Sequence, residues 1–117
     1  MTRTPLQQIS APNLQDWLRS ERPQPLLVDV REAQELEIAP FPLPVLHLPL
    51  SDSSSWLSTL PDALPKDRPV VVLCHAGVRS HHFGLWLLDQ PWELEVWNLD
   101  GGIEAWSLQV DPSVPRY

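Results

Sequence analysis

The sequence has very little cysteine and positive charge, and it has no long apolar run. Cys74 is the single cysteine among 117 residues. A lone cysteine excludes an internal disulfide and any paired-cysteine redox or zinc motif. No stretch reaches the roughly 20 apolar residues that a membrane helix requires. If Cys74 is chemically active, it therefore acts alone or together with a second molecule.

Lysine and arginine are outnumbered by carboxylates, 8 against 15, which gives a net charge of −7. Such a surface repels phosphate backbones and anionic lipids, so we expect no nucleic-acid partner and no membrane role. The first residues, MTRTPLQQISAPN, lack the apolar core of a secretory signal, and the expected location is cytoplasmic. No cluster of His, Cys and Asp has metal-ligand spacing, so we expect no metal and no cofactor.

The acidic residues are unevenly distributed along the chain. No Asp or Glu occurs from Arg68 to Leu88, although this window holds two arginines and three histidines. The pattern indicates that an acidic protein keeps one neighbourhood suited to an anion.

The length predicts one domain, over residues 1–117. Short apolar segments read as strands at 25–30, 45–48, 70–74 and 94–98, with 7–10 as a possible fifth. Helical patterns occupy 12–18, 53–60, 80–90 and 101–108, and Pro61 is expected to end the second of them. Continuous apolar runs such as VVVL are typical of parallel strands covered on both faces. We therefore predict an α/β fold, with a mostly parallel sheet of about five strands between two helical layers.

Cys74 stands at the carboxyl end of the strand 70–74, which is where open parallel sheets bind ligands. The loop that follows, CHAGVRS, supplies two features that stabilise a thiolate: the charge of Arg79 and the N-terminus of a helix beginning near Ser80. Gly77 allows a positive φ, so that backbone N–H groups can point inward at an anion. A cysteine ending a strand is commonly an inert core residue. The spacing and the helix favour a nucleophile instead.

The loop CHAGVRS resembles the active-site loop of the rhodaneses, the thiosulfate sulfurtransferases, in their single-domain form. Three further segments resemble that family in the same order. LLVDVRE carries an Asp-x-Arg turn, VLHLPL matches a strand ending in proline, and NLDGGIEAW is similar to a closing Gly-Gly-x-x-x-Trp segment. The segment ELEIAPFPLPV departs from the His-Ile-x-Gly-Ala stretch of many members. The resemblance implies a rhodanese-like three-layer sandwich.

The resemblance also implies a double displacement. The thiolate of Cys74 would take the sulfane sulfur of a small anion such as thiosulfate, and the resulting persulfide would pass it to a thiol acceptor. That acceptor would be a small thiol or a thioredoxin-like protein. Arg79 would stabilise the thiolate and the donor. The anion-binding loop would consist of His75, Ala76, Gly77, Val78 and Ser80.

Other residues near the loop have two interpretations each. Asp29 either anchors the loop through Arg79 or is a turn or helix cap ahead of the segment REAQEL. Arg31 either lines the approach of the donor or lies on the surface. His75 either assists at the mouth of the site or is simply solvated. His81 and His82 would either contact a partner or have no role.

Two rival functions remain beside sulfur transfer. Four residues separate Cys74 from Arg79, whereas the related phosphatases have five, which favours a sulfurtransferase over a phosphatase or an arsenate reductase. A non-catalytic rhodanese-like module that binds partners or senses redox state is the other alternative. The presence of both Cys74 and Arg79 argues against it.

Overall fold

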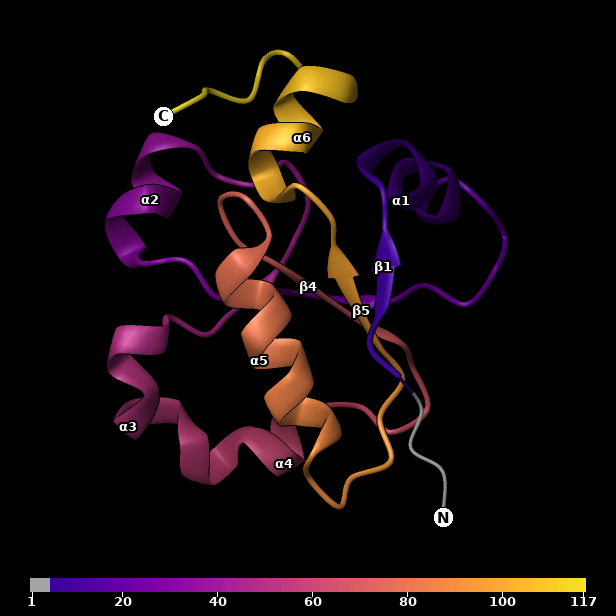
Figure 1. The fold of residues 1–117 in the computed structure, drawn as a ribbon, viewed down its shortest axis with the longest axis vertical. Coiled ribbons are helices and arrows are strands. Elements are labelled where there is room, and N and C mark those ends of the chain that lie inside the picture. Colours follow the sequence, from indigo (N-terminus) through magenta and orange to yellow (C-terminus); the bar gives the residue numbers. More distant parts are fainter. Residues whose placement is uncertain (1–4) are drawn as a thin grey trace.

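Five parallel strands form the centre of the structure, a computed structural model that describes residues 5–117 (Figure 1). They are β1 (Gln7–Ile9), β2 (Leu26–Asp29), β3 (Leu46–His47), β4 (Val70–Leu73) and β5 (Val96–Leu99). Their order across the sheet is β1-β5-β4-β2-β3, and every described pair is parallel. The predicted α/β fold with a parallel five-stranded sheet is confirmed.

Helices cover both faces of the sheet. They are α1 (Ala11–Leu18), α2 (Ala33–Ile38), α3 (Ser53–Trp56), α4 (Leu60–Ala63), α5 (Val78–Leu88) and α6 (Gly102–Gln109). Two 3-10 turns, Leu50–Asp52 and Leu57–Thr59, lie on either side of α3. Among the described residues, no helix has the length and apolarity needed to cross a membrane.

The central strand β4 packs against both helical layers. Val71 and Leu73 face a core shared with α1 and α6, while Val70, Val72 and Cys74 face a second core shared with α4 and α5. Successive side chains of a strand point to opposite faces, so an uninterrupted apolar run is needed where both faces are covered. This packing fixes the end of β4, and with it the position of Cys74.

Two helical predictions need correction. The segment 53–60 is not one helix but α3 and a 3-10 turn, followed by α4. Pro61 lies in the first turn of α4 and does not end a helix, because a proline there removes no hydrogen bond that the helix needs. The helix α5 also begins at Val78, two residues before the predicted start.

The sequence analysis placed no helix over 33–38, where the structure has α2. This short helix begins with a capping box, in which the side chains of Glu32 and Glu35 bond to each other's backbone N–H. Longer helices are predicted from apolar residues at helical spacing, which form a buried face. The helix α2 has no buried residue and so lacks this pattern.

The first turn of α6 contacts the loop after β4 directly. The N–H of Ile103 donates to the carbonyl of Cys74 at 2.9 Å, and that of Glu104 donates to the carbonyl of His75 at 3.0 Å. Gly102 has a φ of +60°, and a Cβ there would lie 2.5 Å from the carbonyl oxygen of Cys74 and closer still to that of His75. Only glycine therefore fits at this contact.

We expect Gly102→Ala to destabilise the protein by about 2–4 kcal/mol, because backbone atoms must move to admit the methyl group. Urea denaturation followed by circular dichroism measures the loss. Gly84→Ala is the control. Gly84 lies within α5, and a Cβ there would meet the end of the flexible Leu6 side chain at 2.8 Å. Equal losses in the two variants would contradict the backbone contact as the cause.

Candidate active site

Two backbone N–H groups of the loop donate to the sulfur of Cys74. The residue is only 1% exposed. Its Sγ accepts bonds from the N–H of Gly77 at 3.1 Å and of Ser80 at 3.4 Å, and it lies 3.2 Å from the hydroxyl oxygen of Ser80. Gly77 has a φ of +99° immediately before α5, which turns the loop around the sulfur. Donors in this arrangement stabilise a negative charge on sulfur.

Asn98 of β5 holds the two sides of this loop together. Its Oδ1 accepts from the Ser80 hydroxyl at 2.5 Å, and its Nδ2 donates to the Gly77 carbonyl at 3.1 Å and to Gln8 Oε1 at 2.9 Å. Asn98 is buried. The sequence analysis did not identify it. The available signal was a polar residue within an otherwise apolar strand, since a buried amide requires partners.

Asp29 and Arg31 form a fully buried ion pair at the end of β2. Both side chains are 0% exposed, and Nη2 of Arg31 lies 2.9 Å from Oδ2 of Asp29. Burial alone would lower the pKa of Arg31, but the bonds to Asp29 and Tyr117 outweigh it, and the pKa is raised. Of the two interpretations of Asp29, the contact with Arg79 is therefore wrong, while Oδ1 of Asp29 accepts from the backbone N–H of Arg31 at 3.0 Å and caps the turn. Arg31 is also not the surface residue that one interpretation described.

Arg79 pairs with Glu35 of α2 in place of Asp29. Its Nη1 and Nη2 donate to the two carboxylate oxygens at 2.6 and 2.9 Å. This bond holds the pKa of Glu35 down at about 2 and raises that of Arg79 above its usual range. A two-point contact of this kind fixes the guanidinium in position and orientation. Sequence analysis missed Glu35 because α2 itself was not predicted.

The C-terminal segment returns to the loop and lies beside α2 and α6 (Figure 1). The ring of Tyr117 stacks on His75 with centroids 4.0 Å apart. Its hydroxyl accepts from Arg31 at 3.0 Å and donates to Glu35 at 2.7 Å. Burial is the main cause that raises the pKa of Tyr117 to about 12. His75 is therefore held by an aromatic neighbour, and is not simply solvated.

The other loop residues face a shallow hollow of about 340 Å³ on the side of the loop toward β1. Its lining includes Ala76, Gly77, Val78, His81 and His82. Within residues 5–117, no group of three or more His, Cys, Asp or Glu side chains is placed to hold a metal ion.

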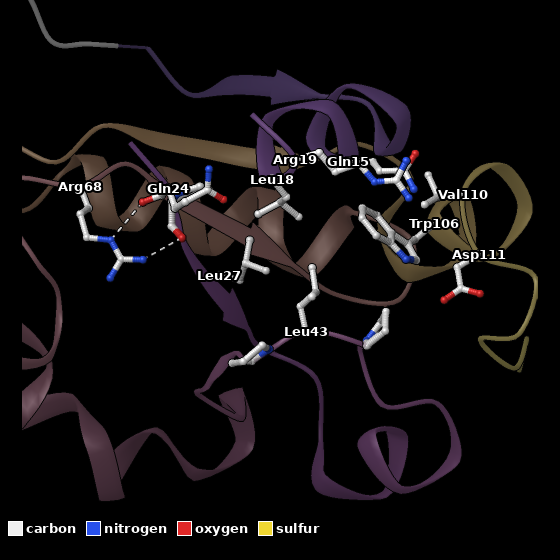
Figure 2. A pocket seen from close by; sticks show the side chains of 13 residues that line it. Gln15, Leu18, Arg19, Gln24, Leu27, Leu43, Arg68, Trp106, Val110 and Asp111 are labelled. Atoms are coloured by element: carbon white, nitrogen blue, oxygen red, sulfur yellow. Dashed lines mark hydrogen bonds between the residues drawn. The ribbon is translucent and has the colours of Figure 1, made fainter. Parts of the chain in front are cut away.

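Figure 2 shows a larger hollow of about 690 Å³, whose lining does not include Cys74. It is lined by residues near the amino ends of β2 and β4, including Leu27 and Arg68, and by Trp106 of α6. The guanidinium of Arg68 donates there to the carbonyls of Gln24 and Pro25. Cys74 lies at the opposite, carboxyl end of β4, so this hollow does not belong to the cysteine site.

The stretch from Arg68 to Leu88 contains no carboxylates, but carboxylates from other parts of the chain lie beside the loop. Arg68, the first residue of this stretch, lies near the amino end of the central strand β4, whereas Cys74 follows its carboxyl end. Glu35 and Glu104, from distant parts of the chain, bring negative charge to Arg79 and His75. The uneven distribution of carboxylates along the sequence therefore does not give this site a surplus of positive charge.

The family model for the rhodanese-like domain matches residues 10–109, which include most of the sheet and the whole loop. The chain belongs to the rhodanese-like domain family. The suspected resemblance is thereby confirmed.

Relatives of this rhodanese-like domain include longer proteins. It is 41% identical over 91 residues to the rhodanese-like/PpiC domain-containing protein 12, chloroplastic, of Arabidopsis thaliana, covering 78% of this chain and 30% of that protein. It is 34% identical over 95 residues to the adenylyltransferase and sulfurtransferase MOCS3 of Drosophila willistoni, covering 79% and 21%. The chain thus spans less than a third of the length of these curated relatives.

A solved structure of similar size shares the fold. The single domain sulfurtransferase RDL2 of Saccharomyces cerevisiae superposes with a TM-score of 0.70 at 19% identity, covering 97% of this chain and 98% of that one. At this identity the likeness shows the common fold of the rhodanese-like domain and no more.

We expect Asp29→Asn to lower the free energy of unfolding by about 3–5 kcal/mol, because it leaves the guanidinium of Arg31 buried without a counter-charge. Urea denaturation gives the value. The matched control is Glu104→Gln, which breaks the pair with the 60% exposed Arg116 and should cost far less. A similar loss in both variants would argue against burial as the cause.

The lowered pKa of Glu35 predicts a dependence of stability on pH. The charged carboxylate is favoured in the folded protein, so its contribution is present above the ordinary pKa of 4.5 and is lost as the pH falls toward about 2. Glu35→Gln should therefore be less stable than the wild type at pH 7, and the difference should shrink in acid. Urea denaturation across this range tests it. A difference that stays constant down to pH 3 is the contrary result.

Proposed function

We propose that this chain is a sulfurtransferase that carries a sulfane sulfur as a persulfide on Cys74. The observation that carries the proposal is the pair of backbone N–H groups, those of Gly77 and Ser80, that donate to its Sγ at the start of α5. Family membership and the name of one relative, which is called an adenylyltransferase and sulfurtransferase, support it. The proposed site consists of Cys74 and Arg79 with the loop between them.

The reaction proceeds in two displacements. The thiolate of Cys74 attacks the outer sulfur of thiosulfate or of an organic persulfide, the S–S bond of the donor breaks, and sulfite or a thiolate leaves. The outer sulfur of the new persulfide bears the negative charge, and loop N–H groups stabilise it. An acceptor thiolate then attacks that sulfur and releases the Cys74 thiolate. Both steps are substitutions at sulfur and consume no external oxidant or reductant.

Arg79 acts through its charge in this scheme. Its pKa is raised chiefly by the Glu35 hydrogen bond, and the nearby sulfur of Cys74 adds to the effect, so the guanidinium stays charged beside the thiolate. His75 and Val78 belong to the rim of the loop, and Asp29 and Arg31 are connected to Arg79 through Tyr117 and Glu35. No cofactor is part of the proposal.

The acceptor is an external thiol, because the chain has no second cysteine to resolve the persulfide. A small thiol and a thioredoxin-like protein both fit this chemistry. The cytoplasmic location and the single domain over residues 1–117 stay predictions. One relative carries the word chloroplastic in its name.

Incubation with thiosulfate or an organic persulfide should add one sulfur atom to the protein, and cyanide or a thiol should remove it. Intact-mass spectrometry measures the addition. Cys74→Ser, which preserves the size of the side chain, should gain no sulfur. No gain with either donor, or a gain in Cys74→Ser, would refute the proposal.

A phosphate-ester assay on the same preparation separates the rival functions. Hydrolysis that depends on Cys74, without sulfur loading, would identify a phosphatase. Activity in neither assay would leave a binding or redox-sensing module. The sulfurtransferase proposal expects sulfur loading and no hydrolysis.

A further inference from the structure

Each arginine near the catalytic loop has its own carboxylate. Arg31 pairs with Asp29, and Arg79 pairs with Glu35. On the far side of His75, Arg116 pairs with Glu104 at 2.5 Å. Three positive charges are thus balanced by three negative ones among the described residues. These arginines and carboxylates together give the mouth of the site no surplus positive charge to offer an incoming anion.

Glu35 is fixed in this position by four hydrogen bonds. Its Oε1 accepts from Arg79 Nη1 at 2.6 Å and from the backbone N–H of Glu32 at 3.1 Å. Its Oε2 accepts from Arg79 Nη2 at 2.9 Å and from the Tyr117 hydroxyl at 2.7 Å. A carboxylate held at both oxygens does not swing aside without losing several charge-assisted bonds at once. It therefore stays on the guanidinium when a donor arrives.

Glu35 occupies the paired Nη donors of the planar guanidinium, which leaves only the remaining N–H groups of Arg79 for a second oxyanion. The double negative charge of a donor such as thiosulfate would be repelled there by the carboxylate that stays nearby. The features that still favour negative charge are the N–H groups of Gly77 and Ser80, both aimed at a single sulfur. They suit a ligand whose charge is small and located on sulfur.

We infer that Glu35 determines the class of sulfur donor, and that it favours an organic persulfide over the thiosulfate dianion. The inference rests on the proposed function and narrows its substrate. Glu35 is a specificity-determining residue, because it acts through Arg79 and does not contact the sulfur that is transferred.

The step with a persulfide donor is balanced within the site. The thiolate of Cys74 attacks the outer sulfur of R–S–SH and forms a new S–S bond. The S–S bond of the donor breaks, and R–S⁻ leaves with the electron pair and takes a proton from solvent. The product is the Cys74 persulfide, with no sulfonate to accommodate and no dianion to expel past Glu35.

The test compares two donors in single-turnover loading of Cys74, followed by intact mass. Thiosulfate and the persulfide of 2-mercaptoethanol, which has no other charged group, are each mixed with the wild type and with Glu35→Gln. The wild type should load faster from the persulfide. Glu35→Gln should raise the ratio of thiosulfate loading to persulfide loading by about tenfold, since one negative charge near the donor is removed.

The ratio separates specificity from general damage, because a misplaced loop or a less reactive sulfur slows both donors alike. Salt gives a second readout. Thiosulfate loading of Glu35→Gln should fall as salt is raised toward about 0.5 M, and that of the wild type should change less. Glu95→Gln is the control, with the same change of net charge at the opposite end of β5, where Glu95 bonds to Trp97. It should leave the ratio unchanged.

Three results would overturn the inference. They are a wild type that loads faster from thiosulfate, a ratio unchanged in Glu35→Gln, and an equal rise in Glu95→Gln. Each of these leaves the sulfurtransferase proposal intact, because Cys74 still becomes loaded. Failure of both donors to load any variant would overturn the proposed function itself, and the inference with it.

Discussion

The contact between the first turn of α6 and the loop after β4 sets the geometry on which the rest of the site depends. Two N–H groups of α6 bind the carbonyls of Cys74 and His75, and Gly102 allows the helix to approach that closely. With these carbonyls directed at α6, the N–H groups further along the loop are left to face the sulfur. The helix α5 and the strand β5 complete the arrangement through Ser80 and Asn98.

A second layer of interactions connects this loop to β2 and α2. Asp29 binds Arg31, Arg31 binds Tyr117, Tyr117 binds Glu35, and Glu35 binds Arg79. The chain of bonds begins at a fully buried pair and ends at a partly exposed arginine. A buried pair is costly to break when only one partner is lost. The orientation of Arg79 is in this way tied to the interior of the protein and not only to its own helix.

Features of the fold that depend on a local pattern of residues could be predicted from the sequence. The apolar run VVVL and the spacing of CHAGVRS were enough to place Cys74, the turn at Gly77 and the start of α5 within two residues. Prediction failed where contacts join distant segments. Glu35 and Tyr117 are 82 positions apart along the chain yet share a hydrogen bond. Asp29 and Arg79 were the plausible partners by residue type, but the sequence does not tell which carboxylate reaches which arginine. The short helix α2, without a buried face, left no periodic signal.

The same distinction explains why a stretch free of carboxylates in the sequence does not make the folded site free of carboxylates. Charge near a site is set by what folds against it, and the carboxylates of α2 and α6 fold against this loop. The sulfur of Cys74 is also almost fully buried. A persulfide extends beyond the thiol by one S–S bond of roughly 2 Å, so loading places the reactive atom farther from the buried Cys74 side chain. Under the proposed function, the thiol is therefore shielded while empty, and the sulfur to be transferred becomes the accessible atom.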